Sequence, residues 1–192
     1  MKIKLKQLSN IMLLANFIST LFYALSYPYI YAEMMKVIPK GYISFEQILA
    51  CGSTVVFCKI WNKNSDKLFR YFPAILIAEV IADTILFIDV IIRKDLNFYF
   101  LLNVIIFSII TRNLSCGRTK MEAKINPSEK LREQYDNNDQ IVYSLATLIG
   151  SVIAIFLPLN LSVLFIFAMI GNVIDNFFYL FIYNQIKNLK VK

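Results

Sequence analysis

Three acidic residues interrupt an otherwise apolar run between positions 71 and 92, namely Glu79, Asp83 and Asp89. As a helix rising about 1.5 Å per residue, this run is long enough to cross the ~30 Å hydrocarbon core of a bilayer. Glu79 and Asp83 are four positions apart, so they share one helix face near the middle of the run. An acid at that depth costs about 2.5 to 3.5 kcal/mol. The fold or the function must offset this cost, so the pair is the first candidate site.

The composition is that of an integral membrane protein, because 58% of the 192 residues are hydrophobic and only 17% are charged. The net charge of +7 comes from basic residues at the ends of apolar runs rather than from one patch, which argues against nucleic-acid binding. Histidine is absent and the three cysteines form no Cys-X-X-Cys motif, so we expect neither a metal site nor a cofactor. The lack of histidine also argues against the histidine-dependent membrane peptidases and phosphatases, and we expect no enzyme.

The apolar runs predict one all-α domain over residues 1–192 with six transmembrane helices. The predicted spans cover residues 8–37, 44–61, 71–92, 97–112, 139–157 and 161–186. Basic residues gather before the first span, after the second, in the connection 113–138 and at the C-terminus. Because basic residues favour the cytoplasmic side, we expect a multi-pass protein of the plasma membrane with both termini in the cytoplasm.

Polar residues form a stripe along two of the predicted spans. In the first span Asn16, Tyr23 and Tyr27 share one face, and in the fourth span Tyr99 and Asn103 are four positions apart. In lipid such a stripe turns inward, toward other helices or a wet cavity. We therefore predict that these five residues line a wet cavity, with hydrogen bonding between helices as the structural alternative.

Asp175 in the sixth span is a third acid near the middle of the membrane, alongside Glu79 and Asp83. No predicted span holds a basic residue at mid-depth, so we expect these acids to have no buried cation from this chain. They must then be protonated, or be neutralised by an arriving proton, metal ion or organic cation. Both cases fit a role in proton or cation coupling, whereas the structural alternative is that protonated acids bond to nearby asparagines and tyrosines.

Two short patterns predict how helices meet. Along the fifth span Ala146, Gly150 and Ala154 recur every four residues, and such a small-residue seam lets another helix approach closely. In the mixed-charge connection before it, Pro127 breaks a predicted helix and Ser128 can cap the next one.

The residues after the second span resemble the loop signature between the second and third helices of major facilitator superfamily transporters. Asp66, Lys67 and Arg70 match its acidic and basic positions. The two glycine positions of the signature hold Asn62 and Phe69 in this chain.

A broader likeness to drug-efflux members of that superfamily covers residues 112–157. It begins with Arg112 at the cytoplasmic end of the fourth helix, continues with Pro127 and Glu129 before the fifth helix, and includes Gly150 within it. Together with the six predicted spans, the chain resembles one six-helix half of such a transporter.

The resemblance implies a half-length secondary transporter of a small molecule or cation, driven by protons or another cation. Two copies inserted in parallel would then form a homodimer in the bilayer, with the first and fourth helices lining the substrate cavity and the third and sixth at the periphery. The five polar residues of the first and fourth spans suit such a substrate cavity. Two alternatives stay open: a non-transporting accessory, immunity or sensor subunit on such a scaffold, and the substrate-binding membrane component of a vitamin importer.

Overall fold

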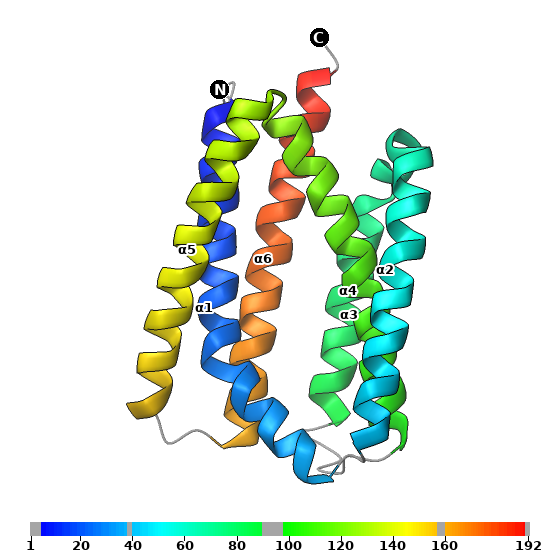
Figure 1. The fold of residues 1–192 in the computed structure, drawn as a ribbon, viewed down its shortest axis with the longest axis vertical. Coiled ribbons are helices and arrows are strands. Elements are labelled where there is room, and N and C mark those ends of the chain that lie inside the picture. Colours follow the sequence, from blue (N-terminus) through cyan, green and yellow to red (C-terminus); the bar gives the residue numbers. More distant parts are fainter. Residues whose placement is uncertain (1–4, 38–39, 90–97, 157–159, 191–192) are drawn as a thin grey trace.

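The computed structural model describes residues 5–37, 40–89, 98–156 and 160–190, and this part of the chain is helical almost throughout (Figure 1). The helices are α1 (Leu5–Val37), α2 (Lys40–Phe69), α3 (Phe72–Ile88), α4 (Phe98–Ile125), α5 (Glu129–Phe156) and α6 (Leu161–Lys190). The predicted all-α fold is confirmed.

Three of these helices are long and apolar enough to cross a membrane, and they contain Leu5–Ala32 of α1, Glu129–Phe156 of α5 and Ser162–Lys187 of α6. The structure is thus compatible with membrane insertion. Helix α3 has 17 described residues, or about 26 Å at ~1.5 Å per residue, which is short of a ~30 Å hydrocarbon core. Six transmembrane spans and their sidedness stay predictions.

The helices form two groups of three. In one group α1 packs against α5 and α6, and in the other α4 packs against α2 and α3. The groups meet mainly where α3 contacts α6, with smaller contacts of α4 with α1 and α6. This pattern is nearly unchanged when α1, α2 and α3 exchange places with α4, α5 and α6, because each strong contact of α1 has its counterpart in α4.

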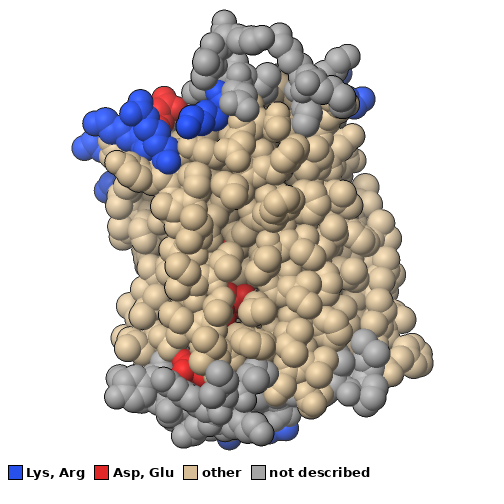
Figure 2. Space-filling view, turned by 180° about the vertical axis from the view of Figure 1, so that it is seen from behind, with Lys and Arg blue, Asp and Glu red and all other residues tan. Residues whose placement is uncertain are grey.

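Both ends of the described chain lie at the same end of the bundle as the α2–α3 and α4–α5 turns (Figure 1, top). This is the set of segments whose basic residues the sequence assigns to one side of the membrane. Basic side chains gather at this end in Figure 2, above a broad band without them in which acidic atoms are visible near the middle.

The α4–α5 turn is tighter than the sequence predicts. Residues 126–128 alone separate the two helices, because the first half of the expected connection 113–138 extends α4 and the second half begins α5. Leu114, Met121 and Ile125 recur at helical spacing and are buried, which holds the extended part of α4 against the bundle. The predicted cap is confirmed, since the backbone N–H of Leu131 donates to Ser128 Oγ at 3.3 Å.

The small-residue seam of α5 is also confirmed. Ala146, Gly150 and Ala154 are buried. A Cβ atom on Gly150 would lie 2.8 Å from the backbone oxygen of Leu21 in α1. A larger residue at position 150 would therefore push α1 and α5 apart.

A second close approach fixes α4 against its own group. A Cβ atom on Gly117 would lie 2.6 Å from the ring of Phe72 in α3 and 3.2 Å from the ring of Trp61 in α2. The indole Nε1 of Trp61 also donates to Asn113 Oδ1 of α4 at 2.8 Å. The backbone of α4 at Gly117 thus lies directly against two buried aromatic rings.

Candidate functional site

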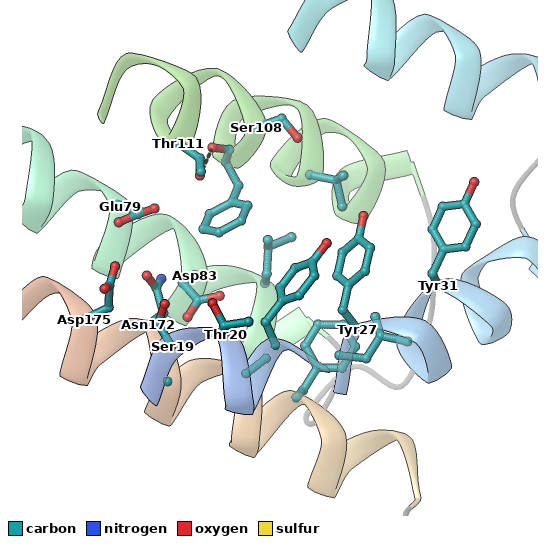
Figure 3. A pocket seen from close by; sticks show the side chains of 18 of the residues that line it. Ser19, Thr20, Tyr27, Tyr31, Glu79, Asp83, Ser108, Thr111, Asn172 and Asp175 are labelled. Atoms are coloured by element: carbon teal, nitrogen blue, oxygen red, sulfur yellow. Dashed lines mark hydrogen bonds between the residues drawn. The ribbon is translucent and has the colours of Figure 1, made fainter. Parts of the chain in front are cut away.

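A cavity of about 440 Å³ lies between the two groups of helices. Most of its lining comes from α1, α4 and α6, and every helix contributes at least one residue. Figure 3 shows Glu79, Asp83 and Asp175 gathered with Asn172 at one end, while Tyr27 lies toward the other end. The cavity therefore has a charged end and an aromatic end.

The aromatic end contains tyrosines from three helices. The rings of Tyr23 and Tyr27 in α1 stack with their centroids 4.5 Å apart, and Tyr27 stacks in turn on Tyr31. Tyr42 of α2 and Tyr143 of α5 also line this part. Tyr23 is 49% exposed, Tyr27 43% and Tyr143 54%, so the cavity is open along its tyrosine side. Two of the residues predicted to line the cavity, Tyr23 and Tyr27, do so.

At the charged end, Arg118 of α4 forms an ion pair with Asp175 of α6. The same guanidinium lies 3.8 Å from Glu79 Oε2 of α3. Glu79 and Asp175 are only 2% and 3% exposed. Asn176 of α6 donates a further hydrogen bond to Glu79 Oε2 at 2.8 Å.

The expectation that these acids have no buried cation from this chain is wrong. Helix α4 continues about three and a half turns beyond the predicted end of its span at residue 112, and this extension carries Arg118 into the bundle. Its neutralising charge offsets part of the cost of burying the two carboxylates. The regular spacing of Leu114, Met121 and Ile125 is the sequence signal from which the extension could have been predicted.

Asp83 completes the charged end without a basic partner among the described residues. Its Oδ2 atom, Oδ1 of Asp175 and Nδ2 of Asn172 are buried and lack a hydrogen-bond partner within the part of the chain that the structure describes. All three residues line the cavity. Since buried polar atoms in native proteins almost always have a partner, these groups are suited to bind water or a polar guest.

Asn16 does not line the cavity, contrary to the prediction. Its Oδ1 accepts a hydrogen bond from the hydroxyl of Tyr179 at 3.0 Å, and its Nδ2 donates to Asp139 Oδ1 at 2.7 Å and to the hydroxyl of Tyr135 at 3.2 Å. The ring of Tyr179 in turn supports the guanidinium of Arg118, which lies 4.3 Å from its centroid. Asn16 therefore links α1 to α5 and α6 through hydrogen bonds, and it reaches the charged end through Tyr179.

The predicted cavity residues of α4 are also not found in the lining. Asn103 Nδ2 donates to Asp89 Oδ2 at 2.6 Å, so its side chain is engaged with the C-terminal end of α3. Asp89 is buried, and this bond satisfies one of its carboxylate oxygens. The side chain of Tyr99 lies outside the described residues. In their place α4 presents Phe107, Ser108 and Thr111 to the cavity.

The residues matched to the loop signature, and Arg112 with them, lie at the surface. Lys67, Arg70 and Arg112 are exposed. Asp66 Oδ1 forms an ion pair with Lys124 Nζ at 3.1 Å, which joins the end of α2 to the end of α4.

The chain matches no family model, no curated protein and no solved structure. Among the described residues, no group of three or more histidine, cysteine or acidic side chains is placed to hold a metal ion.

Proposed function

We propose that this chain is half of a secondary transporter, and that two copies enclose a path for a small molecule whose movement is coupled to protons or another cation. The observation that carries the proposal is the cavity itself. Its charged end is buried between the two groups of helices, and its tyrosine side is open.

The packing of the helices supports this proposal. In each six-helix half of a major facilitator transporter, the first three helices and the last three are inverted repeats of each other. In this bundle the pattern of helix contacts stays nearly the same when α1–α3 are exchanged with α4–α6. Two inverted repeats produce such a pattern. The equivalent helices α1 and α4 supply two walls of the cavity, as the resemblance implies. Helices α3 and α6, which the resemblance puts at the periphery, line the cavity as well.

The charges at the buried end support coupling. The cavity lining includes three carboxylates, of Glu79, Asp83 and Asp175, and one guanidinium, that of Arg118. One arginine cannot balance three ionised acids, so protons or a cationic guest must supply the remaining positive charge. Binding of a cation and release of a proton then compete for the same carboxylates.

The open side supports assembly in pairs. Tyr23, Tyr27 and Tyr143 carry hydroxyl groups on a surface that would otherwise meet lipid. A second copy in the same orientation, related by a two-fold axis along the membrane normal, would cover this side and close the path.

The proposal is tested with purified protein in lipid nanodiscs and in proteoliposomes. We expect a dimer by mass measurement in nanodiscs. We also expect a trapped pH-sensitive dye to report proton movement when a member of a panel of amines, quaternary ammonium ions and neutral sugars is added. Asp83→Asn should abolish this response, whereas Glu133→Gln, at an exposed position on α5, should leave it intact. A strict monomer that gives no response to any probe would contradict the proposal.

One observation favours a second candidate, the substrate-binding membrane component of a vitamin importer. A cavity of about 440 Å³ within one chain is large enough to hold a small ligand by itself. This candidate predicts a monomer that retains an endogenous ligand through purification. Mass spectrometry of the denatured protein would detect it.

A further inference from the structure

Arg118 has a second acidic residue within reach on its own helix. Glu122 follows it by one helical turn, so the two side chains project from the same face of α4. Glu122 is partly buried and forms no ion pair among the described residues. It faces Asp136 and Asp139 of α5, which repel its negative charge.

We propose that Arg118 is an internal counter-ion that exchanges partners, holding Asp175 and Glu79 in the present structure and turning to Glu122 when protons or cations neutralise both of those acids. The structure thereby links the occupancy of the cavity to the protonation of a carboxyl group near the end of the bundle where the termini lie. The proposal rests on the proposed function only in taking a proton or cation as the cavity's guest.

The surroundings of the guanidinium allow this exchange. Its Nε atom is buried and has no hydrogen-bond acceptor among the described residues, so the present pairing does not use all its donors. The ring of Tyr179 supports it from the side, and Asn16 fixes that ring through the tyrosine hydroxyl. A buried guanidinium that loses its carboxylates must find another partner, because an unpaired charge inside a protein is costly. Glu122 is the nearest acid on its own helix.

Charged and titratable groups face Arg118 and Glu122 from four of the helices. They are Glu79 of α3, Asp175 and Tyr179 of α6, and Tyr135, Asp136 and Asp139 of α5, in addition to the two residues of α4.

The protonation of Glu122 gives the exchange its chemical consequence. Burial, followed by the charges of Asp139 and Asp136, raises the pKa of Glu122 to about 7, and Arg118 opposes this rise. A substantial share of Glu122 is therefore protonated at neutral pH. When Arg118 approaches, the carboxyl group loses that proton to the solvent, while the guanidinium keeps its own. Two positive charges, one for each of the two carboxylates, enter the cavity end, and one proton leaves from Glu122.

The exchange can be tested without a substrate. We would titrate the ¹³C-labelled carboxyl groups of the protein in nanodiscs by infrared spectroscopy, using Glu122→Gln to assign the Glu122 band. The double variant Glu79→Gln/Asp175→Asn imitates neutralised acids. We expect the pKa of Glu122 to fall by about one unit or more in this variant, because an opposite charge within about 4 to 6 Å lowers a carboxyl pKa by that amount. Asp83→Asn removes an acid that is not an ion-pair partner of Arg118, and it should shift this pKa far less.

Removing two negative charges also acts on Glu122 directly, so the double variant is repeated with Arg118→Gln. In this triple variant most of the shift should vanish. A Glu122 pKa that stays unchanged in the double variant, or a shift of equal size in the triple variant, would overturn the proposal. If the double variant does not fold, Asp175→Asn alone should lower the Glu122 pKa by a smaller amount. No shift in this single variant would also overturn the proposal. If the protein moves no solute but shows the shift in the Glu122 pKa, the partner exchange of Arg118 stands and the proposed transport function fails. If it moves solute without that shift, only the partner exchange is rejected.

Discussion

Arg118 of α4 and Asp175 of α6 form an ion pair that joins the two groups of helices at the buried end of the cavity. One residue comes from each group, so the pair bridges the interface along which the groups meet. Glu79 of α3, 3.8 Å from the same guanidinium, extends the contact to a third helix. Several consequences of this arrangement and of its surroundings can be measured.

Arg118→Leu should lower the free energy of unfolding by about 3 kcal/mol, because it leaves Asp175 and Glu79 buried without their cation. The measurement is thermal or denaturant unfolding in one detergent. Arg112→Leu, at an exposed position of the same helix, is the matched control and should change little. Adding Glu79→Gln and Asp175→Asn to the Arg118 variant should restore most of the loss. Equal effects of the two arginine substitutions would contradict the buried pair.

Gly150→Ala should destabilise the protein by about 1 to 3 kcal/mol, because its Cβ atom would lie 2.8 Å from a backbone oxygen of α1 that cannot move independently. Gly52 of α2 provides the control, since nothing lies within 4 Å of a Cβ atom placed there. Gly52→Ala should be neutral or stabilising by up to about 1 kcal/mol through its higher helix propensity. If both alanines behaved alike in the same unfolding assay, the close packing of α1 on α5 would be refuted.

Mild oxidation should join Cys58 of α2 to Cys116 of α4, because their Sγ atoms lie 2.8 Å apart. Maleimide labelling of the unfolded, unreduced chain should then find one free thiol of the three. Cys51 cannot replace Cys58, because it lies seven residues away on α2, or about 10.5 Å along the helix axis. In Cys116→Ser both remaining thiols should stay reactive. Three labelled thiols in the oxidised wild type would show that α2 and α4 do not pack in this register.

Glu122 should make the protein less stable as the pH rises toward neutrality. Its folded pKa of about 7 lies above the ordinary value of 4.5, so the folded state retains a proton that the unfolded chain releases between these pH values. The contribution to the free energy of unfolding falls over this range, by at most about 1.4 kcal/mol per pH unit, and levels off above it.

The measurement for Glu122 is the difference in unfolding free energy between the wild type and Glu122→Gln at a series of pH values. The unfolding free energy of the variant should rise relative to that of the wild type between about pH 4.5 and about 7. Glu133→Gln, at an exposed site of α5, should follow the wild type throughout. Parallel curves for the wild type and Glu122→Gln would contradict the raised pKa.

Much of the fold follows from local sequence patterns. The apolar runs predict the order of the helices and, within about four residues, the bounds of α1, α3 and α6. Ser128 predicts the start of α5, and the seam around Gly150 predicts a close approach of another helix. The cost of burying Glu79, Asp83 and Asp175 also indicates correctly that these acids face inward, since all three line one cavity. Each of these inferences depends on residues that are close together in the chain.

The residues that pair with the side chains of the site come from distant segments of the chain, and apolar runs do not reveal such contacts. Arg118 lies in a stretch of mixed charge that a hydropathy argument assigns to solvent, although its apolar face packs in the bundle. Asn16 shares a helix face with the cavity tyrosines, yet Tyr179 and Asp139 from other helices bind it and turn its role into a structural one. Spacing along one helix indicates in which direction a side chain projects, but it does not identify the residue of another helix that the side chain contacts.

Through their contact with Gly117, the aromatic residues Phe72 and Trp61 influence the charged end of the cavity, which they do not contact. Their rings occupy the space beside its backbone, so α4 cannot turn about its own axis without a clash. Arg118 is the next residue along, and its direction of projection depends on that fixed rotation. Changes of shape at Phe72 or Trp61 would therefore alter the electrostatics of the cavity from a different face of the helix. A screen restricted to polar side chains would overlook both residues as determinants of specificity.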